Sequence, residues 1–238
     1  MLKREYEGFE GVQRAKTSNF IPTVLSREEI DAVIRKLKHP FSLIVKMQFG
    51  CGLRLAESVN IRLNCLDFEN GILTIHDGKG KKDRTVPLPK CLEFELKQQI
   101  ERAKNLHRED VAAEFAGVFM PSAVSGTYKQ AAKDLPWQWL FSASTLTYLP
   151  EENEYKRYHT HEKHVSNAIR TAAREIEMMK RVTAHTFRHS FASHLLQNNF
   201  DIRTIQQLMR HGSIKTTMRY LHTVPVASIK EPMSPLDL

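Results

Sequence analysis

The sequence predicts a mostly helical α+β domain with a small antiparallel β-sheet, and three observations support this prediction. Apolar residues recur at helical spacing towards both ends of the chain, as in residues 26–39 and 185–196. Three short apolar runs separated by turn-forming residues lie between these stretches, at residues 66–68, 72–75 and 85–88. The chain of 238 residues is 41% hydrophobic, which is enough for one or two domains with a buried core.

The first elements are marked by capping and proline signals. Residues 1–24 are polar and basic, and we expect an arm or a linker there. A helix is expected over residues 26–39, because Ser26 and Glu29 have the spacing of a capping box and a proline follows the last residue. Residues 41–49 are expected to form a second, buried helix.

The segment after the second helix combines glycines with an arginine. Gly50 and Gly52 stand just before Arg54, and glycine permits the close approach of another backbone, which we expect to be a DNA strand. The turn between the last two expected strands, residues 78–84, is rich in glycine and lysine. Such a basic hairpin loop can deliver an ammonium group to a leaving oxygen as general acid.

Further helices are expected from apolar periodicity over residues 91–106, 110–119 and 165–182. An aromatic cluster with alternating spacing spans residues 136–141, so we expect a strand there. The cluster fits core packing, and it also fits a stacking surface for an unpaired base. Stacking of a base on an aromatic side chain is worth about 1–3 kcal/mol, and Pro136 and Trp139 are the candidates for this role.

No metal and no cofactor are expected. His159, His161 and His164 lie in the segment HTHEKH, which lacks the HExxH spacing of a helical zinc site. We therefore expect these histidines to be solvated or to face DNA. The sequence also lacks the GxxxxGK loop, followed by Ser or Thr, that binds nucleotide phosphates.

The charge and cysteine content indicate a basic protein with reduced thiols. The chain has 35 Lys and Arg against 27 Asp and Glu, a net charge of +8 that favours a polyanionic partner such as DNA. Cys51, Cys65 and Cys91 are odd in number and have no CxxC spacing, which is typical of the cytoplasm. We find no signal peptide and no apolar run approaching the roughly 20 residues of a membrane span, so no membrane partner is expected.

The densest set of candidate catalytic residues lies near the C-terminus. His185 and Arg188 are three positions apart in a helical pattern, so their side chains share a face and can reach one phosphate. His211 follows a second amphipathic segment, and Tyr220 can attack phosphorus to form a covalent phosphotyrosine if nearby cations ease the loss of its proton. Each residue alone is typical of surface or packing positions, whereas the joint pattern, with Arg54 far upstream, favours phosphodiester chemistry.

Four blocks carry a family resemblance: GLRLAESVNIR, GKGKKDRTVPLP, HTFRHSFASHLL and RHGSIKTTMRY. In order and spacing they resemble the signature boxes of the tyrosine recombinases of the phage-integrase type, over residues 25–222. The resemblance implies the catalytic domain of a DNA-cleaving and DNA-joining enzyme that works through a 3′-phosphotyrosine. This chemistry conserves bond energy, so no ATP is expected.

The resemblance also implies a role for individual residues. Phosphate clamps would be Arg54, His185 and Arg188, supported by His211. Lys79 would be the acid for the departing 5′ oxygen, and Tyr220 would be the nucleophile. Glu57 matches an acidic position that is expected to brace the helix after Arg54. The side chains expected to contact DNA are Lys81, Lys82, Arg84, Pro136, Trp139 and His159.

A narrower resemblance concerns residues 119–182, which are similar to the segment that distinguishes integron integrases. It implies that Pro136, Trp139 and His159 hold extrahelical bases of folded single-stranded sites. The C-terminal MSPLDL is also similar to the end of those proteins. Arg210 is a departure, since the family generally has a small residue, often glycine, before the histidine.

The resemblance further implies partners. Such recombinases act as tetrameric synaptic complexes on DNA, and the N-terminal core-binding domain that they usually carry is expected to be absent here. The tail, residues 223–238, is expected either to dock on a neighbouring protomer or to fold back on its own domain. Two other functions stay open: an enzyme like the type IB topoisomerases, and a DNA-binding module that is catalytically incomplete without its N-terminal domain.

Overall fold

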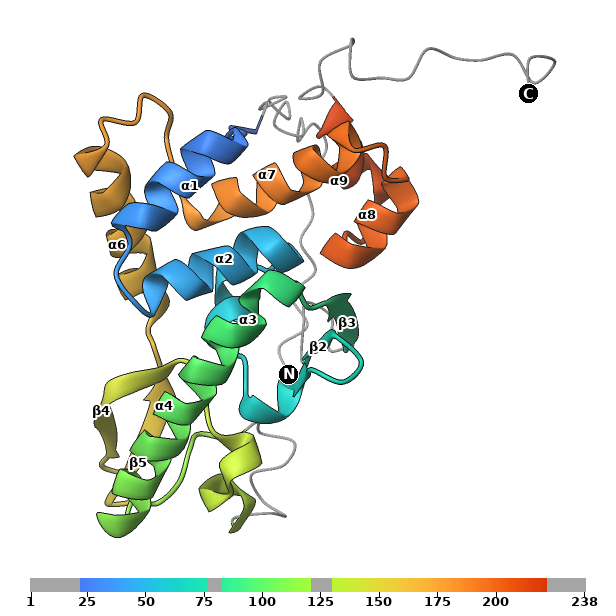
Figure 1. Cartoon of the computed structure of the whole chain (residues 1–238). Coiled ribbons are helices and arrows are strands. Elements are labelled where there is room, and N and C mark those ends of the chain that lie inside the picture. The colour runs from blue at the N-terminus through green and yellow to red at the C-terminus, as the bar shows by residue number, and fades with distance from the viewer. Residues whose placement is uncertain (1–21, 77–82, 121–129, 222–238) are drawn as a thin grey trace, which may run out of the picture.

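The computed structural model describes residues 22–76, 83–120 and 130–221 (Figure 1). The prediction of a mostly helical α+β fold with small antiparallel sheets is confirmed. The helices are α1 (Arg27–Lys36), α2 (Phe41–Cys51), α3 (Leu55–Val59), α4 (Glu93–Ala112), α6 (Glu162–Glu175), α7 (Ala184–Gln197), α8 (Ile202–Met209) and α9 (Ile214–Met218). The strands are β1 (Leu66–Asp67), β2 (Ile72–Ile75), β3 (Arg84–Pro87), β4 (Ser142–Leu149) and β5 (Glu154–His159). Short 3-10 helices span Leu63–Cys65, Lys90–Leu92, Gln130–Lys133 and Leu135–Trp137.

The core lies among α1, α2, α6 and α7, which contact one another (Figure 1). Ile44 and Met47 of α2, Ile169 of α6 and Phe187 of α7 are fully buried in it. Burying one such side chain is worth about 1.5–3 kcal/mol. This packing fixes α2 against α7, and thereby brings the segment after α2 to the face of α7. Among the described residues, no helix is both long and apolar enough to cross a membrane.

Helix α1 begins with the capping box that its sequence predicts. The Ser26 hydroxyl accepts the Glu29 backbone N–H at 3.3 Å, and the Glu29 carboxylate accepts the Ser26 backbone N–H at 2.8 Å. Two of the free N–H groups at the helix start are thereby satisfied. Ile30 and Val33 then face the core.

The first sheet has the antiparallel order β1-β2-β3. Its three strands lie within about one residue of the predicted positions. Leu73, Ile75 and Val86 are buried on one face, as the two-residue period of a strand requires. The register pairs Ile75 with Arg84, so Arg84 stands where β3 leaves the hairpin loop.

Three local predictions were wrong, each for a backbone reason. Residues 136–141 do not form a strand: Leu135–Trp137 is a 3-10 helix, and Trp139 makes only an isolated bridge to Arg62. Pro136 has no N–H to give to a ladder. The helix predicted over residues 110–119 is instead the last turn of α4, which stops before the positive φ angles of Glu114 (56°) and Gly117 (107°). Similarly, α6 ends at Glu175 and not at 182, because Glu177 takes a φ of 50°.

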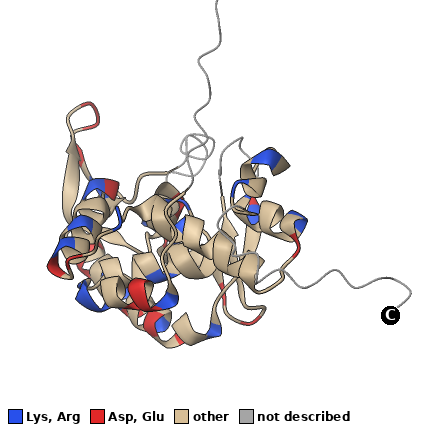
Figure 2. Ribbon diagram, turned by 90° about the horizontal axis from the view of Figure 1, so that it is seen from above, with Lys and Arg blue, Asp and Glu red and all other residues tan. Residues whose placement is uncertain are grey.

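The second hairpin, β4-β5, is antiparallel and stands at the end of the molecule opposite α8 and α9 (Figure 1). Viewed from above, basic and acidic residues are interspersed along the helices (Figure 2).

Candidate active site

Arg188 of α7 lies at the centre of the candidate site. Its guanidinium is buried and donates hydrogen bonds to the backbone carbonyls of Gly52 and Met209. These bonds tie α7 to the C-terminal ends of α2 and α8. Burial, and then the neighbouring Arg54 charge, lower the pKa of Arg188 to about 10, so the side chain is cationic at neutral pH. A guanidinium has five donors, so N–H groups are left for a ligand oxygen.

Glu57 of α3 is the anion around which the arginines gather. Its carboxylate accepts hydrogen bonds from the Arg54 backbone N–H (2.8 Å) and Arg54 Nη1 (2.7 Å), and from Arg84 Nη1 (2.9 Å) and Nη2 (2.7 Å). Arg188 Nη1 lies 3.8 Å away. Burial opposes ionisation, but the hydrogen bonds from Arg84 and Arg54 outweigh it and lower the pKa of Glu57 to about 2. The expectation that Glu57 braces the Arg54 segment agrees with these contacts.

Arg84 does not occupy the DNA-facing position that its place in the basic loop predicted. Its side chain is 8% exposed, and both terminal nitrogens are directed at Glu57. The buried carboxylate attracts it inward, because a charge out of water needs a partner. Arg54 differs, since 26% of its side chain is exposed while Nη2 also reaches the Arg210 carbonyl at 3.4 Å.

The glycine before this cluster serves a contact within the protein. Gly52 caps α2 with a left-handed backbone, φ 63° and ψ 31°. A Cβ built on it would stand 2.5 Å from the Phe191 ring of α7. The close approach that was expected for a DNA strand is therefore made by Phe191. Similarly, a Cβ on Gly50 would stand 2.9 Å from Pro89.

Tyr220 lies just after α9, and its phenol is turned inward. The side chain is 3% exposed and packs in a small apolar cluster with Phe191, Ile205 and Met209. Burial raises the pKa of the phenol, and the cations Arg188, Arg219 and Arg54 only partly oppose that rise. Burial therefore outweighs the cations that were expected to ease ionisation.

His211 lies on one face of this phenol. The two rings are stacked, with centroids 6.0 Å apart and planes at 23°. His211 Nδ1 is hydrogen-bonded to the Thr217 hydroxyl at 2.9 Å. Burial and the charges of Arg188 and Arg54 lower the pKa of His211 to about 4, so the ring is neutral at pH 7.

His189 contacts the phenol directly, and sequence reasoning missed it. Its Nδ1 lies 3.0 Å from the Tyr220 hydroxyl oxygen. The exposed His185 lies one helical turn away, with ring centroids 6.2 Å apart. The available signal was local: His189 follows Arg188 and stands four positions after His185, so it shares the His185 face of α7.

Of the six remaining predicted side chains, three lie in or shortly before the β4-β5 hairpin. Lys79, Lys81 and Lys82 lie outside the described residues. Pro136 is exposed on a 3-10 helix. The remaining two are Trp139, shortly before β4, and His159, the last residue of β5.

Trp139 and His159 correct the prediction of a base-stacking surface. They are 5% and 4% exposed, with ring centroids 5.1 Å apart. The Trp139 indole donates to the Arg157 carbonyl at 3.2 Å, and its ring lies 3.7 Å below the Arg62 guanidinium carbon. These contacts fit the core-packing interpretation, because the ring faces are already covered. In the described part of the chain, no group of three or more His, Cys, Asp or Glu side chains is placed to hold a metal ion.

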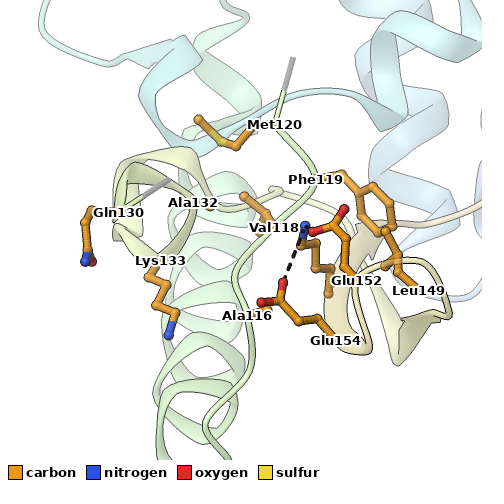
Figure 3. Close-up of a pocket in the computed structure, with 11 residues that line it drawn as sticks. Ala116, Val118, Phe119, Met120, Gln130, Ala132, Lys133, Leu149, Glu152 and Glu154 are labelled. Atoms are coloured by element: carbon orange, nitrogen blue, oxygen red, sulfur yellow. Dashed lines mark hydrogen bonds and ion pairs between the residues drawn. The ribbon is translucent and has the colours of Figure 1, made fainter. Parts of the chain in front are cut away.

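A pocket of about 600 Å³ lies beside the β4-β5 hairpin, at the end of the molecule opposite α8 and α9 (Figures 1 and 3). Its wall combines the apolar Phe119 and Leu149 with charged groups, and Glu154 lies 3.7 Å from the Lys156 ammonium. None of its lining residues belongs to the arginine cluster. The pocket is therefore separate from the candidate active site.

The assembled site consists of cations around a buried phenol. Arg54 and Arg188 both lie beside the Glu57 carboxylate. The positive charges of these two arginines lower the pKa of His211 and, against the larger opposing effect of burial, that of Tyr220. Fixed guanidinium donors beside a hydroxyl are suited to stabilising the charge that develops on a phosphodiester under attack. This arrangement favours nucleophilic phosphoryl transfer.

Comparison with known proteins agrees with this chemistry. A family model described as "Phage integrase family" matches residues 23–225. The chain is 33% identical over 227 residues to an "Integrase/recombinase" of Escherichia coli, covering 94% of this chain and 67% of that protein. It is 32% identical over 235 residues to "Tyrosine recombinase XerA" of Pyrococcus furiosus, covering 98% and 68%. A crystal structure of XerA recombinase superimposes with a TM-score of 0.60 and 23% identity, covering 92% and 64%. The chain thus spans about two thirds of the length of these relatives.

Proposed function

The chain belongs to the phage integrase family, the tyrosine recombinases, and on this premise we propose that it is the catalytic part of a site-specific DNA recombinase of the integron integrase type. The observation that carries the proposal is the convergence of Arg54, Arg188, His211 and Tyr220, which come from distant parts of the sequence. Their chemistry matches the cleavage and rejoining of a DNA phosphodiester. The finer, integron-type assignment is supported by the sequence of residues 119–182.

In the proposed reaction, the Tyr220 oxygen attacks the scissile phosphorus. The phenol releases its proton to water as the P–O bond to tyrosine forms, the P–O5′ bond breaks, and the DNA is held as a 3′-phosphotyrosine. Arg54, Arg188 and His185 donate to the phosphate oxygens, with His211 in support, and the 5′ oxygen takes its proton from Lys79. Attack by a 5′ hydroxyl then reverses these steps and joins the strands without ATP. Because Tyr220 is 3% exposed, groups that cover its hydroxyl must move aside when DNA enters.

The proposed partners are DNA and further protomers of the same protein, in a tetrameric synaptic complex acting in the cytoplasm. Folded single-stranded sites are proposed as substrates. Since Trp139 and His159 are covered, an extruded base would have to be held by other groups of the insert. Candidates for that role are the half-buried Trp137, whose ring centroid lies 5.5 Å from the Arg62 guanidinium carbon, and the exposed Tyr148, Tyr155 and Tyr158 of the β4-β5 hairpin.

The test is the formation of a covalent protein–DNA adduct. Binding sites are first enriched from a random-sequence duplex pool with the Tyr220→Phe chain, and the recovered duplexes are then nicked so that cleavage traps the intermediate. We expect an adduct with the wild-type chain and none with Tyr220→Phe. The same sequences, refolded as hairpins with and without an extruded base, test the integron-type assignment. Equal cleavage of hairpins and duplexes would contradict it.

The same assays separate the alternative functions. A topoisomerase-like enzyme would relax supercoils without exchanging strands between duplexes. A DNA-binding module would bind without forming an adduct at any enriched site. Binding should also weaken steeply with salt, because phosphate contacts release counterions.

A further inference from the structure

The hydroxyl of Tyr220 is held by a side chain outside the predicted catalytic set. His189 stands on α7, and its Nδ1 is 3.0 Å from the phenol oxygen. The ring centroids are 5.5 Å apart with planes at 48°, so the contact is made at the edge of the imidazole and not through its face. Both side chains are at least half-buried, which shields the bond from water.

We propose that His189 is a positioning residue for Tyr220, whose Nδ1 accepts a hydrogen bond from the phenol and orients the hydroxyl for attack. This inference rests on the proposed function. An acceptor on the proton side leaves the oxygen lone pairs free for phosphorus and increases their electron density. No proton transfer is required of His189 for this role.

The charge state of His189 suits an acceptor. Burial, and then the charges of His185 and Arg188, lower the pKa of His189 to about 4. The imidazole is therefore neutral at pH 7 and has one nitrogen without a proton. The phenol, with its raised pKa, keeps its proton and can donate it. A bond from the Tyr220 hydroxyl to Nδ1 is consistent with both states.

His211 is less suited to this role, although it also touches the phenol. It contacts Tyr220 through the face of its ring, and its Nδ1 is bonded to the Thr217 hydroxyl. The other charged groups acting on the phenol are Arg188, Arg219 and Arg54. As cations they can only donate, so they cannot serve as the acceptor.

The kinetic test compares two His189 variants with a control on the same helix. His189→Leu removes the acceptor, whereas His189→Asn keeps a polar group near the Nδ1 position. His194→Leu is the control, because His194 bonds to the Leu25 carbonyl at 2.9 Å and not to Tyr220. In single-turnover cleavage of the nicked substrate, we expect His189→Leu to be slower by about tenfold, equal to about 1.4 kcal/mol. His189→Asn should stay within about threefold of wild type, because an amide also accepts hydrogen bonds.

DNA affinity and thermal unfolding separate positioning from folding. Positioning predicts unchanged DNA affinity for His189→Leu. His194→Leu should lower the melting temperature and leave the cleavage rate of the folded fraction unchanged. Cleavage by His189→Leu at the wild-type rate would overturn the inference, as would an equal slowing by His194→Leu.

A second measurement does not depend on cleavage. In a chain labelled with ¹⁵N-histidine, Tyr220→Phe should shift the His189 Nδ1 resonance towards that of an unbonded acceptor and leave His194 unmoved. An unchanged His189 resonance, or one that shows a protonated Nδ1 in the wild type, refutes the inference. If the wild-type chain forms no adduct, the proposed function fails, while the resonance still decides the contact.

Discussion

Glu57 and Arg84 form a two-pronged ion pair that joins helix α3 to strand β3. Arg84 Nη1 and Nη2 donate to the two carboxylate oxygens at 2.9 and 2.7 Å, and both side chains are 8% exposed. The same carboxylate holds Arg54. The hairpin and the arginine segment are thereby fixed to each other through one anion.

Removing Arg84 should be costly. Arg84→Met leaves the Glu57 charge buried with one partner fewer, and breaking a buried pair typically costs about 3–5 kcal/mol. Because Arg54 still holds the carboxylate, we expect the free energy of unfolding to fall by about 3 kcal/mol, measured by urea denaturation. Arg27→Met is the control, since the Arg27–Asp31 pair is 65% and 42% exposed and should change stability by less than about 1 kcal/mol. If the two variants lost similar amounts of unfolding free energy, the buried Arg84–Glu57 pair would contribute no more to stability than the exposed Arg27–Asp31 pair.

Gly52 should tolerate no side chain. Its φ of 63° disfavours an L-residue, and a Cβ would stand 2.5 Å from Phe191. Gly71 is the matched control, because its φ is 64° and a Cβ there would meet nothing within 4 Å. We expect Gly71→Ala to cost about 1 kcal/mol for the backbone alone and Gly52→Ala about 3 kcal/mol, the difference being the clash. Thermal unfolding of the two variants measures this difference in stability. Equal destabilisation by the two substitutions would show that the Phe191 ring moves aside at little energetic cost.

Arg210→Gly should stabilise the chain. Arg210 caps α8 with a left-handed backbone, φ 49° and ψ 58°, which costs a non-glycine residue about 1 kcal/mol. The carbonyl that Arg54 contacts belongs to the backbone and is kept. We expect the free energy of unfolding to rise by about 0.5 kcal/mol, since glycine also gains freedom in the unfolded chain. Arg203→Gly, within α8, should instead lower the free energy of unfolding by about 1 kcal/mol. A loss in both variants would mean that the Arg210 side chain matters more than its backbone.

Acid should destabilise the fold through His189 and His211. The pKa of each ring is lowered to about 4, against about 6.5 in an unfolded chain. Between these values the unfolded state binds protons that the folded state does not, so stability is lost as pH falls from about 6.5 to about 4. Discounted for partial exposure, the two rings together should account for about 3 kcal/mol. Urea denaturation of the double variant H189N/H211Q across this range should show a flatter profile, and an unchanged slope would refute the assignment.

The sequence predicted a secondary-structure element best where that element depends on residues close together in the chain. Ser26 and Glu29 predicted the start of α1, because a capping box acts over three residues. The strands of the first sheet were equally accessible, since alternation and turn residues are local. Residues 136–141 failed because their aromatic alternation comes from a 3-10 turn and an inward-facing loop, which a two-residue period does not distinguish from a strand.

By itself, the sequence determined the fold class, the helices around the core and the chemical types of the site residues, since these follow from periodicity and spacing. Only the tertiary structure decided that Arg84 pairs with Glu57, that the Arg62 guanidinium covers the Trp139 ring, and that His189 is hydrogen-bonded to Tyr220. The physical reason is distance along the chain. The contacts of Arg84 with Glu57, His189 with Tyr220 and Arg188 with Gly52 span 27, 31 and 136 residues. The Arg188–Gly52 contact depends on the packing of α2 against α7, and the His189–Tyr220 contact on that of α8 against α7 and α9. The Arg84–Glu57 contact joins β3 to α3. No local sequence pattern encodes these tertiary arrangements.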